Sequence, residues 1–171
     1  MPHGQQQGPF DIKRALLETY AVNEQMNQHL LENLDERSWR AIPPNGKGRT
    51  ISAIAAHIHN VRVMCLKMAK APMVPKQLNR HTLTRKEALA GLTRSHHAIE
   101  TLLTESLATN GRIKGFPPDV VGFVGRLICH DAHHRGQICT IARETGYPLS
   151  AEATIAMWDW SKLRKQCGLG S

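Results

Sequence analysis

The chain has 171 residues, a formal net charge of +8 at pH 7 and 41% hydrophobic residues, which suits one domain with its own core. It contains no apolar run near the ~20 residues that a membrane-spanning helix needs, and its polar N-terminus lacks the apolar segment of a secretory signal. We therefore expect a cytoplasmic protein outside the membrane, with residues 1–9 as a flexible lead and residues 10–167 as a single domain.

The positive charge is scattered along the chain. No run of five or six basic residues occurs, and no aromatic residues alternate with the lysines and arginines. This pattern argues against a nucleic-acid partner. It favours solubility, or attraction of an anionic small molecule, as the consequence of the charge.

The cysteines form no CxxC pair, and three of them fall within helical patterns, as small core side chains in a reducing cytoplasm do. Nothing in their spacing indicates a catalytic nucleophile. The four are Cys65, Cys129, Cys139 and Cys167.

Three long segments with hydrophobic residues at helical spacing occupy the first two thirds of the chain. The first covers residues 11–34. The second, residues 51–71, follows Thr50, whose side chain suits an N-cap. After a connecting loop at residues 72–83, the third extends to residue 108 and opens with a capping-box sequence, Thr84-Arg85-Lys86-Glu87.

A fourth long helical segment begins near Pro118 and Asp119, which suit a first turn, and ends at Gly146, where a left-handed cap is expected. Residues 150–166 predict a shorter helix that contains Trp158 and Trp160. These two aromatics either line a pocket or, as is usual in a terminal helix, seal the core. Alternating strand patterns are absent. We therefore predict an all-α fold, an antiparallel four-helix bundle with a short additional C-terminal helix.

Two histidines stand one helical turn apart in the fourth segment. His130 and His134 share a helix face because residues at i and i+4 are stacked, and they fall between Leu127 and Ile138 in the apolar stripe. His133 lies about 100° away on the helix and is expected to face the side or solvent. Two imidazoles at stacked core positions favour a shared divalent metal over two separately hydrogen-bonded core histidines.

The second helical segment offers a third imidazole. His57 lies three residues after Ile54 and four before Val61, on the flank of the apolar stripe. His59 falls on a face that we expect to be more polar, with Ser52, Arg62 and Leu66. We therefore predict His57, not His59, as the third ligand. Three imidazoles leave a coordination position open for water or substrate, as catalytic sites do.

His96, in the third segment, also faces inward. Three roles are open to it: a fourth ligand, a partner that orients a ligand, or, most simply, a core histidine hydrogen-bonded to a buried polar group. Exposed or loop positions explain the remaining histidines, so we assign no function to His3, His29, His81 and His97.

These features together resemble the DinB/YfiT-like family. The resemblance rests on Ala56-His57-Ile58, on the Asn23-containing first helix and on the motif His130-x-x-x-His134-Arg135-Gly136-Gln137-Ile138, and it covers about residues 10–160. It implies a metal held by three histidines, which map to His57, His130 and His134, a pocket at one end of the bundle, and frequent homodimers. Related bundles include thiol-dependent transferases and isomerases that use glutathione, mycothiol or bacillithiol. Asp131 departs from the family pattern, in which a glutamate more often follows the first histidine of the pair.

The residues near these histidines supply no convincing general base, so the catalytic and cofactor-binding residues are unassigned. Asp131 is expected to turn away from the ligands. Tyr20 and Asn23 could be pocket groups, but a role in core packing is preferred for both. We expect Arg135 in a structural salt bridge, or beside an anion at the pocket. Gly136 suits the close approach of a neighbouring helix.

The function expected from these observations is that of a metal-dependent enzyme, a thiol-dependent transferase or a hydrolase acting on a small molecule. Zinc and nickel suit imidazole ligands best, and iron is also compatible. A low-molecular-weight thiol is a candidate second cofactor. The alternative is a metal-binding stress-response protein without catalysis, and a DNA-binding accessory protein is suggested by charge alone.

Overall fold

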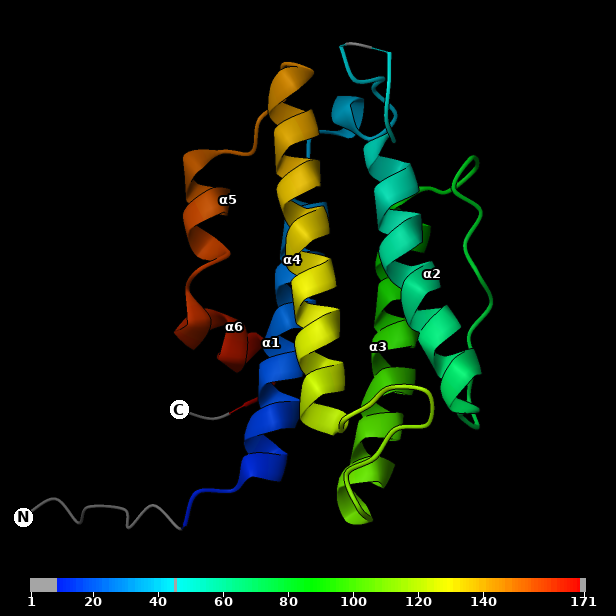
Figure 1. Cartoon of the computed structure of the whole chain (residues 1–171). Coiled ribbons are helices and arrows are strands. Elements are labelled where there is room, and N and C mark those ends of the chain that lie inside the picture. Colours follow the sequence, from blue (N-terminus) through cyan, green and yellow to red (C-terminus); the bar gives the residue numbers. More distant parts are fainter. Residues whose placement is uncertain (1–8, 45, 170–171) are drawn as a thin grey trace, which may run out of the picture.

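The computed structural model describes residues 9–44 and 46–169, so residues 1–8 of the predicted N-terminal lead lie outside it. The described residues contain six α-helices, one short 3-10 helix and no strand, which confirms the all-α prediction. None of these helices is long and apolar enough to cross a membrane. Four long helices lie alongside one another (Figure 1): α1 Ile12–Glu32, α2 Ile51–Ala69, α3 Arg85–Ala108 and α4 Val120–Glu144.

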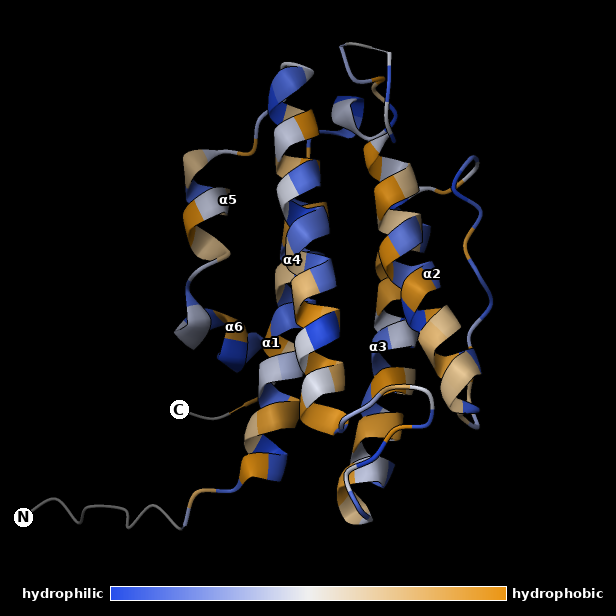
Figure 2. Cartoon of the chain, in the orientation of Figure 1, coloured by the Kyte–Doolittle hydropathy of each residue, from blue (hydrophilic) through white to orange (hydrophobic). Residues whose placement is uncertain are grey.

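The helices begin where the sequence offers capping side chains. The Thr50 hydroxyl accepts a hydrogen bond from the Ala53 amide at the start of α2, and the Asp119 carboxylate accepts one from the Gly122 amide at the start of α4. Thr84 and Glu87 form the predicted reciprocal capping box of α3. Hydrophobic and hydrophilic residues are mixed along each long helix (Figure 2), and the buried hydrophobic residues of the four helices form the core.

The chain direction differs from a simple antiparallel bundle. α1 and α4 run in one direction and α2 and α3 in the other (Figure 1), so the contacting pairs α1/α4 and α2/α3 are parallel, whereas α1/α3, α2/α4 and α3/α4 are antiparallel. The reason is the connection at residues 70–84, which returns along the whole length of α2 before α3 begins. Fifteen extended residues can span about 50 Å, whereas the 19-residue α2 is only about 29 Å long.

The core is divided into two apolar clusters with a polar layer between them. One cluster joins the later part of α1 with the beginnings of α2 and α3, and the other joins the early part of α1 with their ends. Along every long helix, buried polar residues separate the two clusters, including Asn23 and Glu24 of α1, Arg62 of α2, His96 of α3 and Asp131 of α4. This layer positions the candidate site.

The C-terminal segment forms two short helices instead of the one predicted, α5 Ala151–Ala156 and α6 Trp160–Gln166. The break arises because the Asp159 side chain accepts a hydrogen bond from the Lys162 amide and caps a new helix. Trp158 and Trp160 are 70% and 47% exposed, so neither seals the core. Leu163 does this instead, buried against Val22 and Met26 of α1.

The four cysteines are free thiols. Cys65 is buried in the core, Cys139 and Cys167 are partly buried, and Cys129 is exposed. The predicted role as a small core side chain therefore fits Cys65 best. Burial raises the pKa of the Cys65 thiol to about 11, which disfavours the reactive thiolate near neutral pH.

Candidate metal centre

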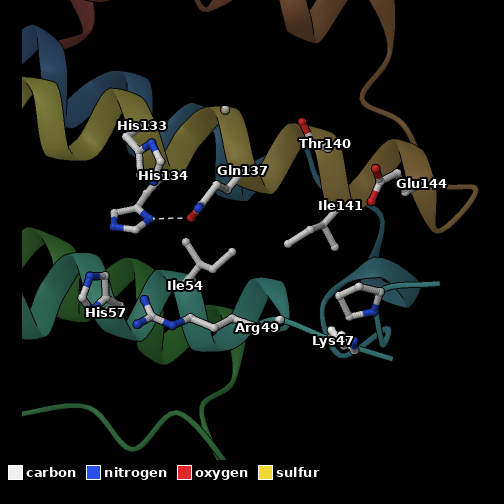
Figure 3. A pocket seen from close by; sticks show the side chains of 13 residues that line it. Lys47, Arg49, Ile54, His57, His133, His134, Gln137, Thr140, Ile141 and Glu144 are labelled. Atoms are coloured by element: carbon white, nitrogen blue, oxygen red, sulfur yellow. Dashed lines mark hydrogen bonds between the residues drawn. The ribbon is translucent and has the colours of Figure 1, made fainter. Parts of the chain in front are cut away.

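The three histidines singled out in the sequence meet between α2 and α4. His57 comes from α2, whereas His130 and His134 lie one turn apart on α4, and one nitrogen of each lies within 4.8 Å of the other two. The ring centroids are 4.4–5.2 Å apart, and the His57 and His130 Nε2 atoms are separated by 3.3 Å. His134 is buried, while His57 and His130 are partly exposed. Figure 3 shows His57 and His134 on facing helices at one end of a pocket.

Hydrogen bonds at the far side of two rings direct the remaining nitrogens toward one another. His134 Nδ1 lies 2.8 Å from Gln137 Oε1 (Figure 3), and His130 Nδ1 lies 3.5 Å from Asp131 Oδ1. Both oxygens only accept hydrogen bonds, so they favour a proton on Nδ1 and leave the Nε2 lone pair free. Partners of this kind accompany histidine ligands in metal sites.

The donor set fits a divalent cation. With Zn–N bonds of about 2.0–2.1 Å and a tetrahedral angle, two imidazole nitrogens on one zinc ion lie about 3.3–3.4 Å apart. The 3.3 Å between His57 and His130 Nε2 matches this separation. Three imidazole nitrogens in this arrangement are therefore compatible with one shared ion.

Local electrostatics keep two of the imidazoles neutral. Burial, and then the nearby Arg49 guanidinium, lowers the pKa of His57 to about 4. Burial also lowers the pKa of His134. At neutral pH both rings are therefore in the form that offers a lone pair to a metal.

Asp131 differs from the sequence expectation because it contacts a predicted ligand. It is fully buried on the α1 side of α4, yet its Oδ1 reaches the His130 ring. Its Oδ2 accepts hydrogen bonds from Arg62 Nη2 at 2.6 Å, Asn23 Nδ2 at 2.8 Å and Asn27 Nδ2 at 2.9 Å. Burial alone would raise the pKa of Asp131, but the Arg62 guanidinium and these hydrogen bonds hold it below its usual value.

The face of α2 that was expected to be more polar is buried. Arg62 is fully buried and also donates to Glu24 Oε2 at 2.7 Å, so one guanidinium joins two carboxylates. The two His59 ring nitrogens lie 2.8 Å from the Gly91 carbonyl oxygen and 2.9 Å from that of Lys76. These partners come from α3 and from the connection at residues 70–84, which the periodicity of α2 alone does not reveal.

Arg135 and Gly136 also differ from their predicted roles. Among the described residues Arg135 forms no salt bridge; its Nη1 donates to Asn23 Oδ1 at 2.8 Å and Asn27 Oδ1 at 2.7 Å. Gly136 is exposed at the pocket, and a Cβ added there would meet no atom within 4 Å, so no neighbouring helix requires a glycine. Tyr20 and Asn23 are buried in the interior, Tyr20 in an apolar cluster and Asn23 in the polar layer.

His57 and His59 should respond differently to substitution. His57→Ala should remove the metal bound at this centre. His59→Ala should retain the metal but lower the free energy of unfolding by about 1–3 kcal/mol, because the Gly91 and Lys76 carbonyls lose their partner. Metal content by elemental analysis and thermal melts measure the two effects. Metal loss in His59→Ala alone would show that the wrong face of α2 was chosen.

Gln137 should tune metal affinity without binding the ion. Gln137→Leu removes the acceptor at His134 Nδ1, and we expect metal affinity to fall by about 10–100-fold. Competition with a chromophoric chelator measures this affinity. Thr140→Val, a change at the wall of the same pocket, is the matched control and should bind as the wild type does. Equal affinity in both variants would argue against an orienting role for Gln137.

The pocket beside the three histidines has a volume of about 860 Å³ and lies between α2, α4 and the segment before α2. His133, exposed as predicted, lies on its wall. Lys47 and Arg49 add positive charge, and Glu144 is the acidic residue on its lining. Figure 3 shows the Arg49 side chain extending toward His57. The centre therefore opens into a pocket with a basic side.

His96 does not fit two of its three predicted roles. It lies outside the three-histidine group, which rules out a fourth ligand. Its ring stacks on Tyr20 with centroids 4.9 Å apart, and its Nδ1 is buried with no hydrogen-bond partner in residues 9–44 and 46–169. The expectation of a satisfied core histidine is therefore wrong as well.

Comparison with known families agrees with this geometry. The family model described as the DinB superfamily matches residues 19–138, which is more than half of the chain and includes His57, His130 and His134. No curated protein matches the chain significantly. On the family match, this chain belongs to the DinB superfamily.

Proposed function

We propose that this protein is a metal-dependent enzyme, a thiol-dependent transferase or a hydrolase, with the metal held by His57, His130 and His134 in a four-helix bundle. The observation that carries the proposal is the convergence of three imidazole nitrogens, two of them from His57 and His134, which line a large pocket. A pocket of about 860 Å³ falls within the range of small-molecule sites. A structural zinc site would instead be closed by a fourth protein ligand.

The protein groups around the centre have separate tasks in this proposal. Gln137 and Asp131 orient the rings of His134 and His130, and burial keeps the His57 imidazole neutral. A zinc or nickel ion, or iron, would lower the pKa of a bound water or thiol and so supply a nucleophile near neutral pH. Three protein ligands leave room for that group.

The pocket charge indicates the class of substrate. Arg49 points toward His57 (Figure 3) and is close enough to lower its pKa, so an anion bound near Arg49 lies beside the metal ligands. Lys47 adds a second positive charge to the lining. A small anionic molecule, such as a low-molecular-weight thiol that carries carboxylates, suits this arrangement. We further expect the protein to act as a homodimer.

The experiment is an assay of metal-loaded protein with glutathione and an activated aryl chloride, in which a C–S bond forms and chloride leaves. We expect turnover that is lost with chelator and in His134→Ala. Arg49→Ala should raise the KM for glutathione more than it lowers kcat, whereas Arg94→Ala, an exposed change on α3, should alter neither. Turnover that survives chelation would contradict the proposal. Metal binding without thiol-dependent turnover would contradict the transferase and leave a hydrolase or a non-catalytic metal-binding protein.

A further inference from the structure

A second group of metal-type donors lies on α3 and plays no part in the centre between α2 and α4. His96, His97 and Glu100 each place one donor atom within 4.8 Å of the other two. His96 and Glu100 are stacked at i and i+4, and His97 Nδ1 lies 3.4 Å from Glu100 Oε2. The residues that line the hollow at this group come from α1, α3 and the end of α6.

The buried ring of His96 is the strongest sign that this group binds a ligand. A buried nitrogen without a partner, such as its Nδ1, is rare in folded proteins. Stacking on Tyr20 restricts the ring orientation. Burial also lowers the pKa of His96, so the ring is neutral near pH 7 and offers a lone pair.

The hollow next to these side chains is accessible to a small ion. It has a volume of about 250 Å³ and is lined by Glu24 and Cys167 as well as by the three donors. The Glu24 carboxylate is already bound by Arg62 and Gln28. The side chains of His97 and Glu100 are 63% and 42% exposed, so an ion reaches them from solvent.

We propose that His96, His97 and Glu100 form a second binding site for a first-row divalent cation, with Zn²⁺ as the best match. Two imidazoles and one carboxylate are a donor set that zinc sites use, and water completes the coordination of such an ion. Such an ion would take as one ligand His96, a buried side chain whose Nδ1 has no hydrogen-bond partner among the described residues.

A Zn²⁺ titration of the full chain, freed of metal beforehand and followed by calorimetry, tests the proposal. The wild type should bind two equivalents, and His97→Ala and Glu100→Gln should each bind one. Both substituted side chains are partly exposed, so folding should be preserved. Glu105→Gln, an exposed change on the same helix, and His81→Ala, an exposed histidine elsewhere, are the matched controls and should bind two.

His57→Ala separates this proposal from the one for the first centre. If both sites exist, His57→Ala also binds one equivalent, and the double variant with His97→Ala binds none. If only the α3 site exists, the wild type binds one equivalent that His97→Ala removes and His57→Ala does not. Unchanged stoichiometry and affinity in both His97→Ala and Glu100→Gln would overturn the second site.

Discussion

Arg62→Met is expected to lower the free energy of unfolding by about 3–5 kcal/mol, because it leaves the buried carboxylates of Glu24 and Asp131 without their shared cation. Arg62 is fully buried, and its two ion pairs are 2.7 and 2.6 Å long. Methionine fills a similar volume, so the loss reports the unpaired charges more than a cavity. Urea unfolding followed by circular dichroism measures the change.

Two further variants define the cause of that loss. Arg94→Met, the same change at an exposed position on α3, should be nearly neutral. Adding Glu24→Gln to Arg62→Met should recover part of the stability, because one of the two unpaired charges is removed. An Arg62→Met protein as stable as the Arg94→Met control would show that the buried network does not support the fold.

Removing either stacked histidine of α4 should abolish the first metal centre. His130→Ala and His134→Ala should each bind one equivalent of Zn²⁺ fewer than the wild type, since each removes one of three donors. His133→Ala should bind the wild-type amount, because this side chain is exposed and outside the donor group. Elemental analysis after gel filtration gives the metal content per chain.

His133→Ala is the most sensitive control, because His133 is adjacent to His134 and lines the same pocket. If His133→Ala loses the metal and His134→Ala keeps it, the face of α4 has been assigned wrongly. The helical fold of each variant should remain intact, because His130 is only partly buried and the network around Asp131 remains in place.

The sequence predicted the helices well because their signals are local. Thr50, the Thr84–Glu87 capping box and Asp119 mark the helix starts within one or two residues. Helix direction is not a local property. The periodicity of α3 is the same whether it runs with or against α2, and the path of residues 70–84 decides between the two. The cap at Asp159, which divides the C-terminal segment, was a local signal that the prediction missed.

The candidate site was partly predictable for the same reason. The i, i+4 spacing predicted that His130 and His134 share one face of α4. The position of His57 beside the apolar stripe of α2 predicted that it joins them. The Arg62 network was missed because each of its charged members looks like a surface residue on its own helix. Only the arrangement of α1, α2 and α4 in space shows that Glu24 and Asp131 both contact Arg62.

X-ray absorption spectroscopy of the zinc-loaded His97→Ala protein tests most directly whether three imidazoles share one ion. This variant keeps the centre formed by His57, His130 and His134 and disrupts the group on α3. We expect one zinc per chain with three imidazole nitrogens at about 2.0–2.1 Å and at least one oxygen ligand from solvent. Zinc bound through fewer than three imidazoles, or no bound zinc, would contradict it.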